Sequence, residues 1–266
     1  MWPLAVITFK EGLRTRVFQA LSVLAVCLFL LTAAFSSFFA RDVVKVAVDL
    51  SLSGMMFSGL LFTLFVGSSL IAKDLDRRTI HTVLSKAISR PTYVVGKFVG
   101  LALLITVAMV ALGCLASLSV WYVDRITSDV YGVVTWSGFW AAILMGILML
   151  IVLASVGFFF ASFQSNSLLG LGLTVMVYYI GQSIEQVKLF LLTAETGSQI
   201  PSLVHHVVVG ASYLFPNFVA FDLKLQAAHG LLVPQSHLLW LVVYGASYSG
   251  ILILLACWFF RRREFP

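Results

Sequence analysis

The stretch GFWAAILMGILMLIVLASVGFFFAS, residues 138–162, contains no charged side chain. A helix needs roughly 20 consecutive apolar residues to cross the hydrocarbon core of a bilayer, and this stretch is longer than that. Inside a bilayer, backbone N–H and C=O groups must pair within their own segment, which a helix achieves. The stretch therefore predicts a membrane-spanning α-helix.

Similar runs recur along the whole chain, which has 266 residues, of which 61% are hydrophobic and 11% charged. Its mean hydropathy is +1.03, whereas soluble domains are only about half apolar. The charge-free run 130–184 is interrupted by FQSNS at 163–167, so we divide it into two spans. The sequence predicts a single-domain, all-α integral membrane protein with six transmembrane helices, at 17–40, 50–72, 98–123, 138–162, 167–186 and 238–260.

The distribution of Lys and Arg predicts the orientation of these spans. With six spans, both termini and the loop 73–97 lie on one side, which holds 12 of the 17 basic residues. Basic loops are retained in the cytoplasm, so both termini are expected there, in a membrane of the bacterial cytoplasmic type. The net charge of +6 reflects this bias, and we infer no nucleic-acid partner.

The first 16 residues have the pattern of an amphipathic helix lying in the membrane interface. Apolar residues from Trp2 to Val17 recur at helical spacing on one face, with Lys10 and Arg14 elsewhere. We expect an elbow helix over 1–16 that carries Lys10, Glu11 and Arg14. The alternative is a plain extension of the first span.

The loop AKDLDRRTIHTVLSKAISRPTYVVGKFVG, residues 72–100, gathers eight charged residues. Within it, apolar residues from Ile80 to Ile88 recur with the spacing of one helix face, and Pro91 ends the pattern. A short helix of this kind is marginal on its own in water. Its apolar face must therefore dock on the lipid interface, on neighbouring helix ends or on a soluble partner.

Residues 187–237 form the longest region between two predicted spans and hold four of the five histidines. Pro201 and Pro216 break it, and broken backbone at membrane depth must be buried in protein or line a cavity. We expect a re-entrant or lid region on the outer side, with a candidate outer gate at Phe215, Pro216, Asn217 and Phe218. His205-His206 lacks the H-E-x-x-H pattern, and the three cysteines lack a C-x-x-C pair, so no metal site is predicted.

Several kinds of chemistry are missing from the sequence. No predicted span has a charged residue near its centre, which disfavours an ion-coupled carrier. The chain also lacks the G-x-x-x-x-G-K-[ST] phosphate loop, so we expect neither enzymatic activity nor a directly bound cofactor. A charged cytoplasmic helix beside such a membrane core suits a permease whose ATPase is a separate chain.

The loop also resembles the cytoplasmic signature of ABC-2-type exporter permeases. The matching residues are Asp74, Asp76, Thr79-Ile80, Val83-Leu84, Ile88-Ser89-Arg90, Tyr93 and Gly96-Lys97, whereas Arg78 and Ala87 replace the usual glycine and proline. ITFKEGLRTRVF at 7–18, YLFPNFVAFDL at 213–223 and FFRRRE at 259–264 are similar to other parts of this family. Within the family, the chain is most similar to single-domain permeases such as that of the nitrous-oxide-reductase maturation exporter.

The resemblance implies a homodimer in the bilayer with two soluble ABC ATPase subunits, which would bind ATP and Mg. The segment 73–93 would be the coupling loop, and the expected ATPase contacts are Asp74, Asp76, Arg77, Arg78, His81 and Arg90. The candidate residues lining the dimer interface or the transport path are Phe57, Phe62, Phe65, Met176, Tyr178 and Tyr179. Two alternatives remain, a membrane scaffold that recruits a soluble enzyme without transport and a passive channel.

Overall fold

The computed structural model describes residues 2–15, 19–20, 23, 26–27, 29–31, 34, 43–76, 89–127, 134–164, 166–193 and 202–262. Throughout these residues the regular secondary structure is helical, and they contain no strand. The elements are α1 (Trp2–Leu13), α3 (Val43–Asp76), α5 (Arg90–Thr127), α6 (Trp136–Phe163), α7 (Ser167–Thr193), α8 (Ser202–Leu214), the 3-10 helix η2 (Val219–Phe221), α9 (Lys224–Ala228) and α10 (Gln235–Arg262).

Five of the described helices, α3, α5, α6, α7 and α10, are long and apolar enough to cross a membrane. A sixth crossing results if the bent pair His206–Leu214 and Val219–Ala228, which meet at 53°, is counted as one span. The five helices overlap five of the expected spans, while most of the expected span 17–40 lies outside the described residues. The chain is thus an all-α, multi-pass membrane protein.

The helices extend beyond the charge-free runs from which the spans were predicted. α5 begins at Arg90 rather than near residue 98, and its 38 residues measure about 57 Å at 1.5 Å per residue. This exceeds the hydrocarbon thickness of roughly 30 Å, so the ends of α5 reach into the headgroup regions. A charged residue marks the edge of the hydrocarbon, but it does not end a helix.

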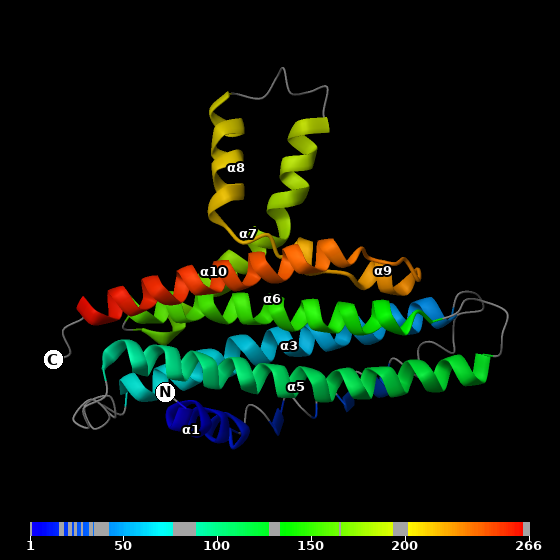
Figure 1. Ribbon diagram of the computed structural model, residues 1–266, viewed down its shortest axis with the longest axis horizontal. Coiled ribbons are helices and arrows are strands. Elements are labelled where there is room, and N and C mark those ends of the chain that lie inside the picture. The colour runs from blue at the N-terminus through cyan, green and yellow to red at the C-terminus, as the bar shows by residue number, and fades with distance from the viewer. Residues whose placement is uncertain are drawn as a thin grey trace.

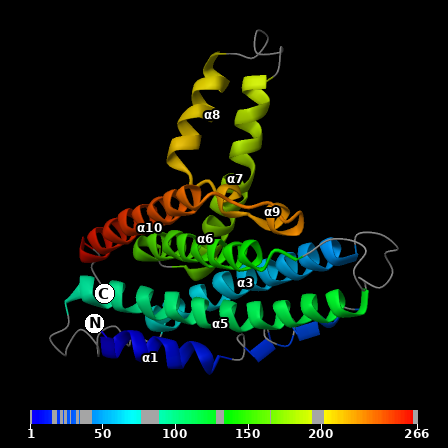
Figure 2. The ribbon, with the colours of Figure 1, turned by 45° about the vertical axis from the view of Figure 1, so that its right-hand side comes forward.

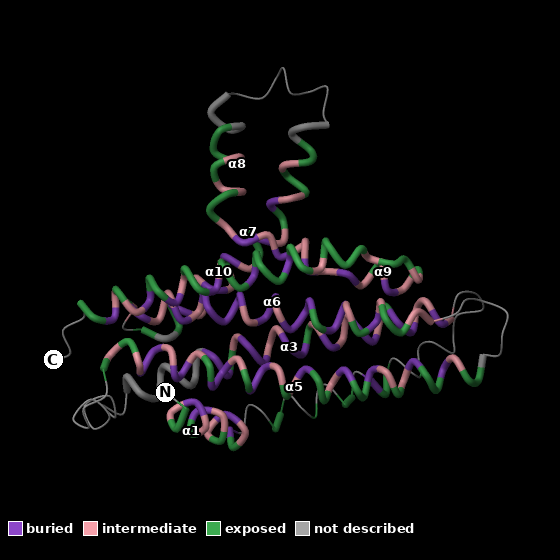
Figure 3. Tube along the Cα trace, viewed as in Figure 1, coloured by how far each residue is buried: buried purple, intermediate pink, exposed green. Residues whose placement is uncertain are grey.

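Helix α6 forms the centre of the molecule. It packs against α3, α5, α7 and α10, and Phe139, Ile143 and Leu150 on it are fully buried. Figure 3 shows the buried residues concentrated on α6, α3 and the inner faces of their neighbours. Because α6 is apolar on all sides, a central position removes the most apolar surface from its surroundings.

Helix α1 lies against α5 through its small residues. Ala5, Thr8 and Gly12 are its buried positions, and a Cβ atom on Gly100 of α5 would lie 2.7 Å from the Ala5 carbonyl oxygen and the Thr8 Cβ. Trp2, which the helical pattern placed on the apolar face, is exposed. Close approach of the two backbones therefore holds α1 on α5, and the large apolar residue at its start remains free to contact lipid.

The ends of the bundle are readily distinguished in Figure 1. The end of α3, the start of α5 and the end of α10 lie together at the left, whereas α5 ends and α6 begins at the right. The second half of α7 and α8 lie side by side and project from the other helices (Figures 1 and 2).

Candidate functional site

The start of α5 is defined by the residues that follow the expected coupling segment. Ser89 caps the helix, because its Oγ accepts a hydrogen bond from the Thr92 backbone N–H at 3.4 Å and lies 2.6 Å from the Thr92 Oγ1. Pro91 lies in the first turn, where its missing N–H has no intrahelical partner to lose. The Ser-Arg-Pro-Thr sequence thus places Arg90 as the first residue of the helix.

Arg90 joins the start of α5 to the end of α10. Its Nη1 donates a hydrogen bond to the carbonyl oxygen of Arg261 at 2.9 Å, across 171 positions of sequence. The last carbonyls of a helix lack intrahelical donors and carry the negative end of its dipole, so a guanidinium is a favourable partner there. The rings of Tyr93 and Phe260 also stack, with centroids 5.8 Å apart. We call these contacts the α5–α10 junction.

Lys97, one turn after Tyr93, is a buried cation beside this junction. Only 7% of the residue is exposed, and its Nζ lies 5.7 Å from the centroid of the Tyr93 ring. A desolvated cation over an aromatic face is stabilised by up to about 2 kcal/mol. Lys97 matches the family pattern but was not predicted as a site residue, although its i, i+4 spacing to Tyr93 is present in the sequence.

The candidate gate residues lie between α7 and α10, where Asn217 contacts both helices. Its side-chain Nδ2 donates to Glu185 Oε2 of α7 at 2.7 Å, and its backbone N–H donates to the hydroxyl of Tyr244 on α10 at 3.0 Å. Its Oδ1 accepts the backbone N–H of Ala220 at 3.3 Å, which shapes the turn into η2. Asn217 therefore connects two helices and the chain that follows it.

Aromatic packing and close backbone contact hold the rest of segment 215–218. Phe218 is fully buried, with its ring 5.7 Å from that of Tyr178, and its N–H donates to the Gly181 carbonyl at 3.3 Å. A Cβ atom on Gly181 would collide with the Pro216 carbonyl oxygen and lie 2.6 Å from the Phe218 ring. The segment can take this position because residue 181 lacks a side chain.

Residues on both sides of segment 215–218 contact the middle of α10. The hydroxyl of Tyr248 donates to the carbonyl of Leu214 at 2.9 Å, and Phe221 stacks on Tyr244 at 5.9 Å. Tyr248 lies 13 positions after Gln235, where α10 begins, which corresponds to about 20 Å along the helix. The chain between α8 and α10 thus enters the bundle rather than lying across its end.

Glu185 lies near the end of the expected span 167–186, whereas the helix α7 continues beyond that span. α7 continues to Thr193 because Val187, Leu189 and Phe190 maintain its apolar character. Glu185 therefore lies inside the helix, where the hydrogen bond from Asn217 offsets part of the cost of placing a carboxyl group among apolar residues.

The other predicted site residues are placed as follows. Lys10 is exposed on α1, Glu11 is half-buried there, and Arg14 is exposed just after it. Asp74 and Asp76 lie in the last turn of α3, with only their backbone described. Arg77, Arg78 and His81 lie outside the described residues. The contacts of Asp74, Asp76, Arg77, Arg78 and His81 with an ATPase remain a prediction.

The candidate lining residues divide into two groups. Phe57 and Phe65 on α3, with Met176 and Tyr179 on α7, are exposed on two helices that pack together. Two other residues face inward: Phe62 is buried in the core, and Tyr178 is half-buried and accepts a hydrogen bond from Gln182. The other four residues are exposed. They are the residues of the predicted set that a second protein surface could contact.

No metal-binding cluster accompanies these contacts in the described part of the chain. Among those residues, no three His, Cys, Asp or Glu side chains are placed to hold one metal ion. The contacts described above are the α5–α10 junction at one end of α10 and the packing of the chain around segment 215–218 against its middle.

Comparison with known proteins gives one clear result. No curated protein matches the chain. A family model described as "ABC-2 family transporter protein" matches residues 2–258, which is nearly the whole chain. That match includes Arg90 and Tyr93, which are the α5 half of the junction, and the segment held by Asn217, whereas Phe260 and Arg261 lie just beyond it. The chain therefore belongs to the ABC-2 family and is the transmembrane component of an ABC transporter.

Proposed function

We propose that the chain is the permease subunit of an ATP-driven exporter and works as a homodimer with two separate ATPase subunits. ATP and Mg bind to those subunits, and both termini lie in the cytoplasm of a cell with a bacterial-type membrane. The observation that carries the proposal is the α5–α10 junction, because it ties a third helix to the segment on which the ATPase would act.

The first step of the mechanism is the transfer of movement from the coupling segment to three helices. Segment 73–93 includes the last turn of α3 and the first turn of α5, so a partner that moves it displaces both helices. The junction adds α10, through an exposed charge-assisted hydrogen bond and an aromatic pair worth about 0.5–1.5 kcal/mol. These contacts couple the end of α10 to the start of α5.

The second step uses α10 to move segment 215–218. Tyr248 lies 12 positions before Phe260, about 18 Å along one continuous helix. A shift of the junction therefore displaces the hydroxyls of Tyr244 and Tyr248, which bond to the backbone of Asn217 and Leu214. We infer that substrate held between two copies is released as this segment moves.

The homodimer is supported by the projecting part of α7 and α8. Phe190, Val207 and Tyr213 are exposed there, so this part of the chain presents apolar surface away from its own bundle. Ser183 and Gln186 are exposed on the same part of α7. Polar side chains within a membrane helix favour contact with another helix, where they find hydrogen-bond partners, over contact with lipid. A second copy of the chain would cover the exposed apolar side chains and would offer hydrogen-bond partners to Ser183 and Gln186.

The first test is purification of the tagged chain from its native host in a gentle detergent, followed by mass spectrometry. We expect a soluble ATPase with a phosphate loop at equal stoichiometry. A chain that purifies alone, or with a partner lacking that loop, would contradict the proposal and favour a channel or a scaffold.

A second test separates ATPase binding from transmission through the junction. Phe260→Ala removes the stack on Tyr93 but leaves segment 73–93 intact, so the ATPase should remain bound. Transport-coupled ATP turnover should fall about two- to tenfold, the effect of losing one aromatic pair. Leu254→Ala, an exposed position on the same helix, is the matched control and should leave turnover unchanged. Equal turnover in both variants would exclude α10 from transmission.

A further inference from the structure

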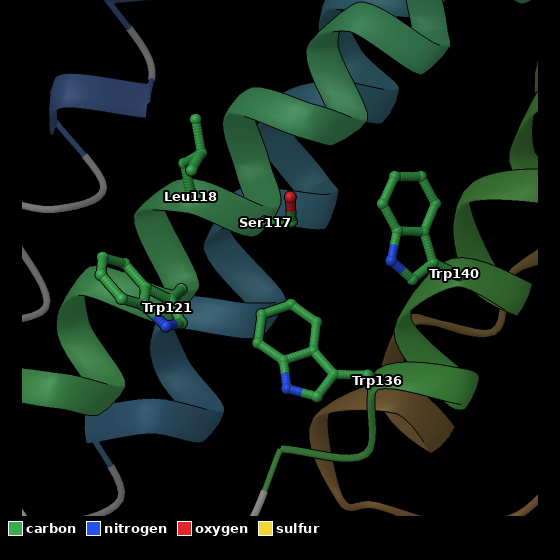
Figure 4. Close-up of a pocket in the computed structure, with 5 residues that line it drawn as sticks. All are labelled: Ser117, Leu118, Trp121, Trp136 and Trp140. Carbon is green, nitrogen blue, oxygen red and sulfur yellow. The ribbon is translucent and has the colours of Figure 1, made fainter.

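A groove of about 330 Å³ lies between α5 and α6, at the opposite end of the bundle from the junction. Its lining residues are Ser117, Leu118, Trp121, Trp136 and Trp140. In Figure 4, Trp136 and Trp140 extend from α6 toward α5, and Ser117 faces them from α5. Three of the six tryptophans in the chain border this one space. Its volume is within the range of about 300–1,000 Å³ that is typical of ligand pockets.

The groove is placed just below the level of lipid headgroups. Lys97 and Arg125 lie 28 positions apart on α5, which is about 42 Å along the helix. This matches the roughly 40–45 Å thickness of a bilayer including its headgroup regions. Trp121 lies one turn before Arg125, and Trp136 is the first residue of α6, so the groove opens where hydrocarbon gives way to headgroups.

The lining of the groove favours an occupant that is largely apolar. Its walls are three indole rings and the Leu118 side chain, and all four of these residues are exposed. The Ser117 hydroxyl already donates to the carbonyl of Cys114 at 2.8 Å within α5, so it needs no polar partner from a ligand. The remaining polar groups of the lining are the three indole N–H donors, which suit an occupant that is mostly apolar and carries hydrogen-bond acceptors at one end.

The rim of the groove carries a positive charge. The Arg125 guanidinium is exposed, lies 5.5 Å from the centroid of the Trp121 ring, and forms no ion pair within the described residues. The first turn of α6 borders the same groove, and the dipole of a helix is positive at its start. An apolar channel below a cationic rim matches an acyl chain joined to an anionic headgroup.

We propose that this groove is a binding site for one membrane phospholipid, whose acyl chain lies between the indoles and whose phosphate pairs with Arg125. Tryptophans at a membrane interface commonly form a belt around a protein. Here, however, they come from two helices and border one open groove next to one arginine. The site is separate from the α5–α10 junction and from segment 215–218, and the proposal does not depend on transport.

Brominated phospholipid tests the proposal because bromine quenches nearby tryptophan fluorescence. Trp2, Trp240 and Trp258 are first replaced by phenylalanine, so that the fluorescence reports only the three tryptophans of the groove. The full-length chain, in detergent, is titrated with phosphatidylglycerol brominated on its acyl chains. We expect quenching that saturates at one lipid per chain, and inorganic phosphate alone should not prevent it.

Two variants and one control make the result specific. Arg125→Gln should raise the half-saturating lipid concentration about tenfold, since a charge-assisted contact is lost. Leu118→Phe adds bulk to the groove without adding a tryptophan, and it should abolish saturable quenching without lowering the thermal midpoint. Arg262→Gln is the matched control, because Arg262 has the same i, i+4 spacing to an aromatic residue at the other end of the bundle: its guanidinium lies 4.0 Å from the centroid of the Trp258 ring, which is phenylalanine in this background. It should leave the titration unchanged.

Three results would overturn the proposal. Quenching that rises in proportion to lipid without saturation would mean that the groove is part of the general lipid-facing surface. An equal effect of Arg125→Gln and Arg262→Gln would mean that the charge acts at long range only. A dimeric chain whose groove tryptophans are protected from bromolipid from the outset would mean that a second copy, not a lipid, covers the groove.

Discussion

Replacing Gly181 with alanine should unseat segment 215–218. The added Cβ would collide with the carbonyl oxygen of Pro216 and lie 2.6 Å from the Phe218 ring. Neither neighbour can yield easily, because one is backbone and the other is a fully buried ring. Overpacking of this kind costs about 1–3 kcal/mol.

The added methyl group raises the free energy only of the state in which segment 215–218 packs against residue 181, and it does not destabilise the helix α7 itself. Alanine favours a helix over glycine by about 0.5–1 kcal/mol, but that gain applies whether the segment is seated or not. The equilibrium for local opening should therefore rise about five- to 150-fold, at 1.4 kcal/mol per factor of ten. The thermal midpoint of the whole protein should change much less than local opening does.

Hydrogen exchange measured by mass spectrometry on the chain in lipid nanodiscs would detect this opening. The backbone amides of Asn217, Phe218 and Ala220 all donate hydrogen bonds in the seated segment, so their exchange should accelerate together. Gly172→Ala on the same helix is the control, because a Cβ atom there meets nothing within 4 Å. If both variants exchange like the unmodified protein over residues 215–221, the seating of the segment against Gly181 is wrong.

Three further predictions concern the contacts on either side of this segment. Tyr248→Phe removes the hydroxyl that bonds to the Leu214 carbonyl and should weaken the seating by about 1 kcal/mol, visible as roughly fivefold faster exchange near that carbonyl; unchanged exchange would refute it. Arg90→Gln should preserve ATPase binding but lower coupled ATP turnover, if its main partner is the end of α10; loss of binding in a pull-down would instead assign it to the ATPase contact. Gly100→Ala should displace α1 and lower the thermal midpoint, whereas Gly250→Ala, which meets nothing within 4 Å, should not; equal midpoints would contradict the packing of α1 on α5.

The membrane spans could be predicted because their signal is local. A run such as 138–162 contains its own evidence, since length and lack of charge alone decide whether a helix fits a bilayer. The charge-free runs do not show where the helices begin and end. α5 starts at Arg90, eight positions before the expected span, because Ser89 and Pro91 start a helix outside the hydrocarbon, where a search for charge-free residues cannot detect it.

The candidate site was predicted only in part, since most of its contacts join distant parts of the sequence. Asn217 was selected from a proline-containing loop pattern, but its partners Glu185 and Tyr244 could not be identified from that pattern. Likewise, nothing local links Arg90 to a carbonyl 171 positions later. One signal was available and missed: Tyr244 and Tyr248, at i, i+4 spacing, place two hydroxyls on one side of an otherwise apolar helix.

The contacts of Tyr248 and Phe260 also restrict insertions and deletions in the stretch of α10 between them. Tyr248 faces segment 215–218 and Phe260 faces α5, so the residues between them set the angle between two binding faces. One inserted or deleted residue would rotate one face by about 100° relative to the other and shift it by about 1.5 Å. Substitutions on the exposed side of this stretch, such as at Leu254, leave that angle intact. Residues 249–259 should therefore tolerate changes of identity far better than changes of number.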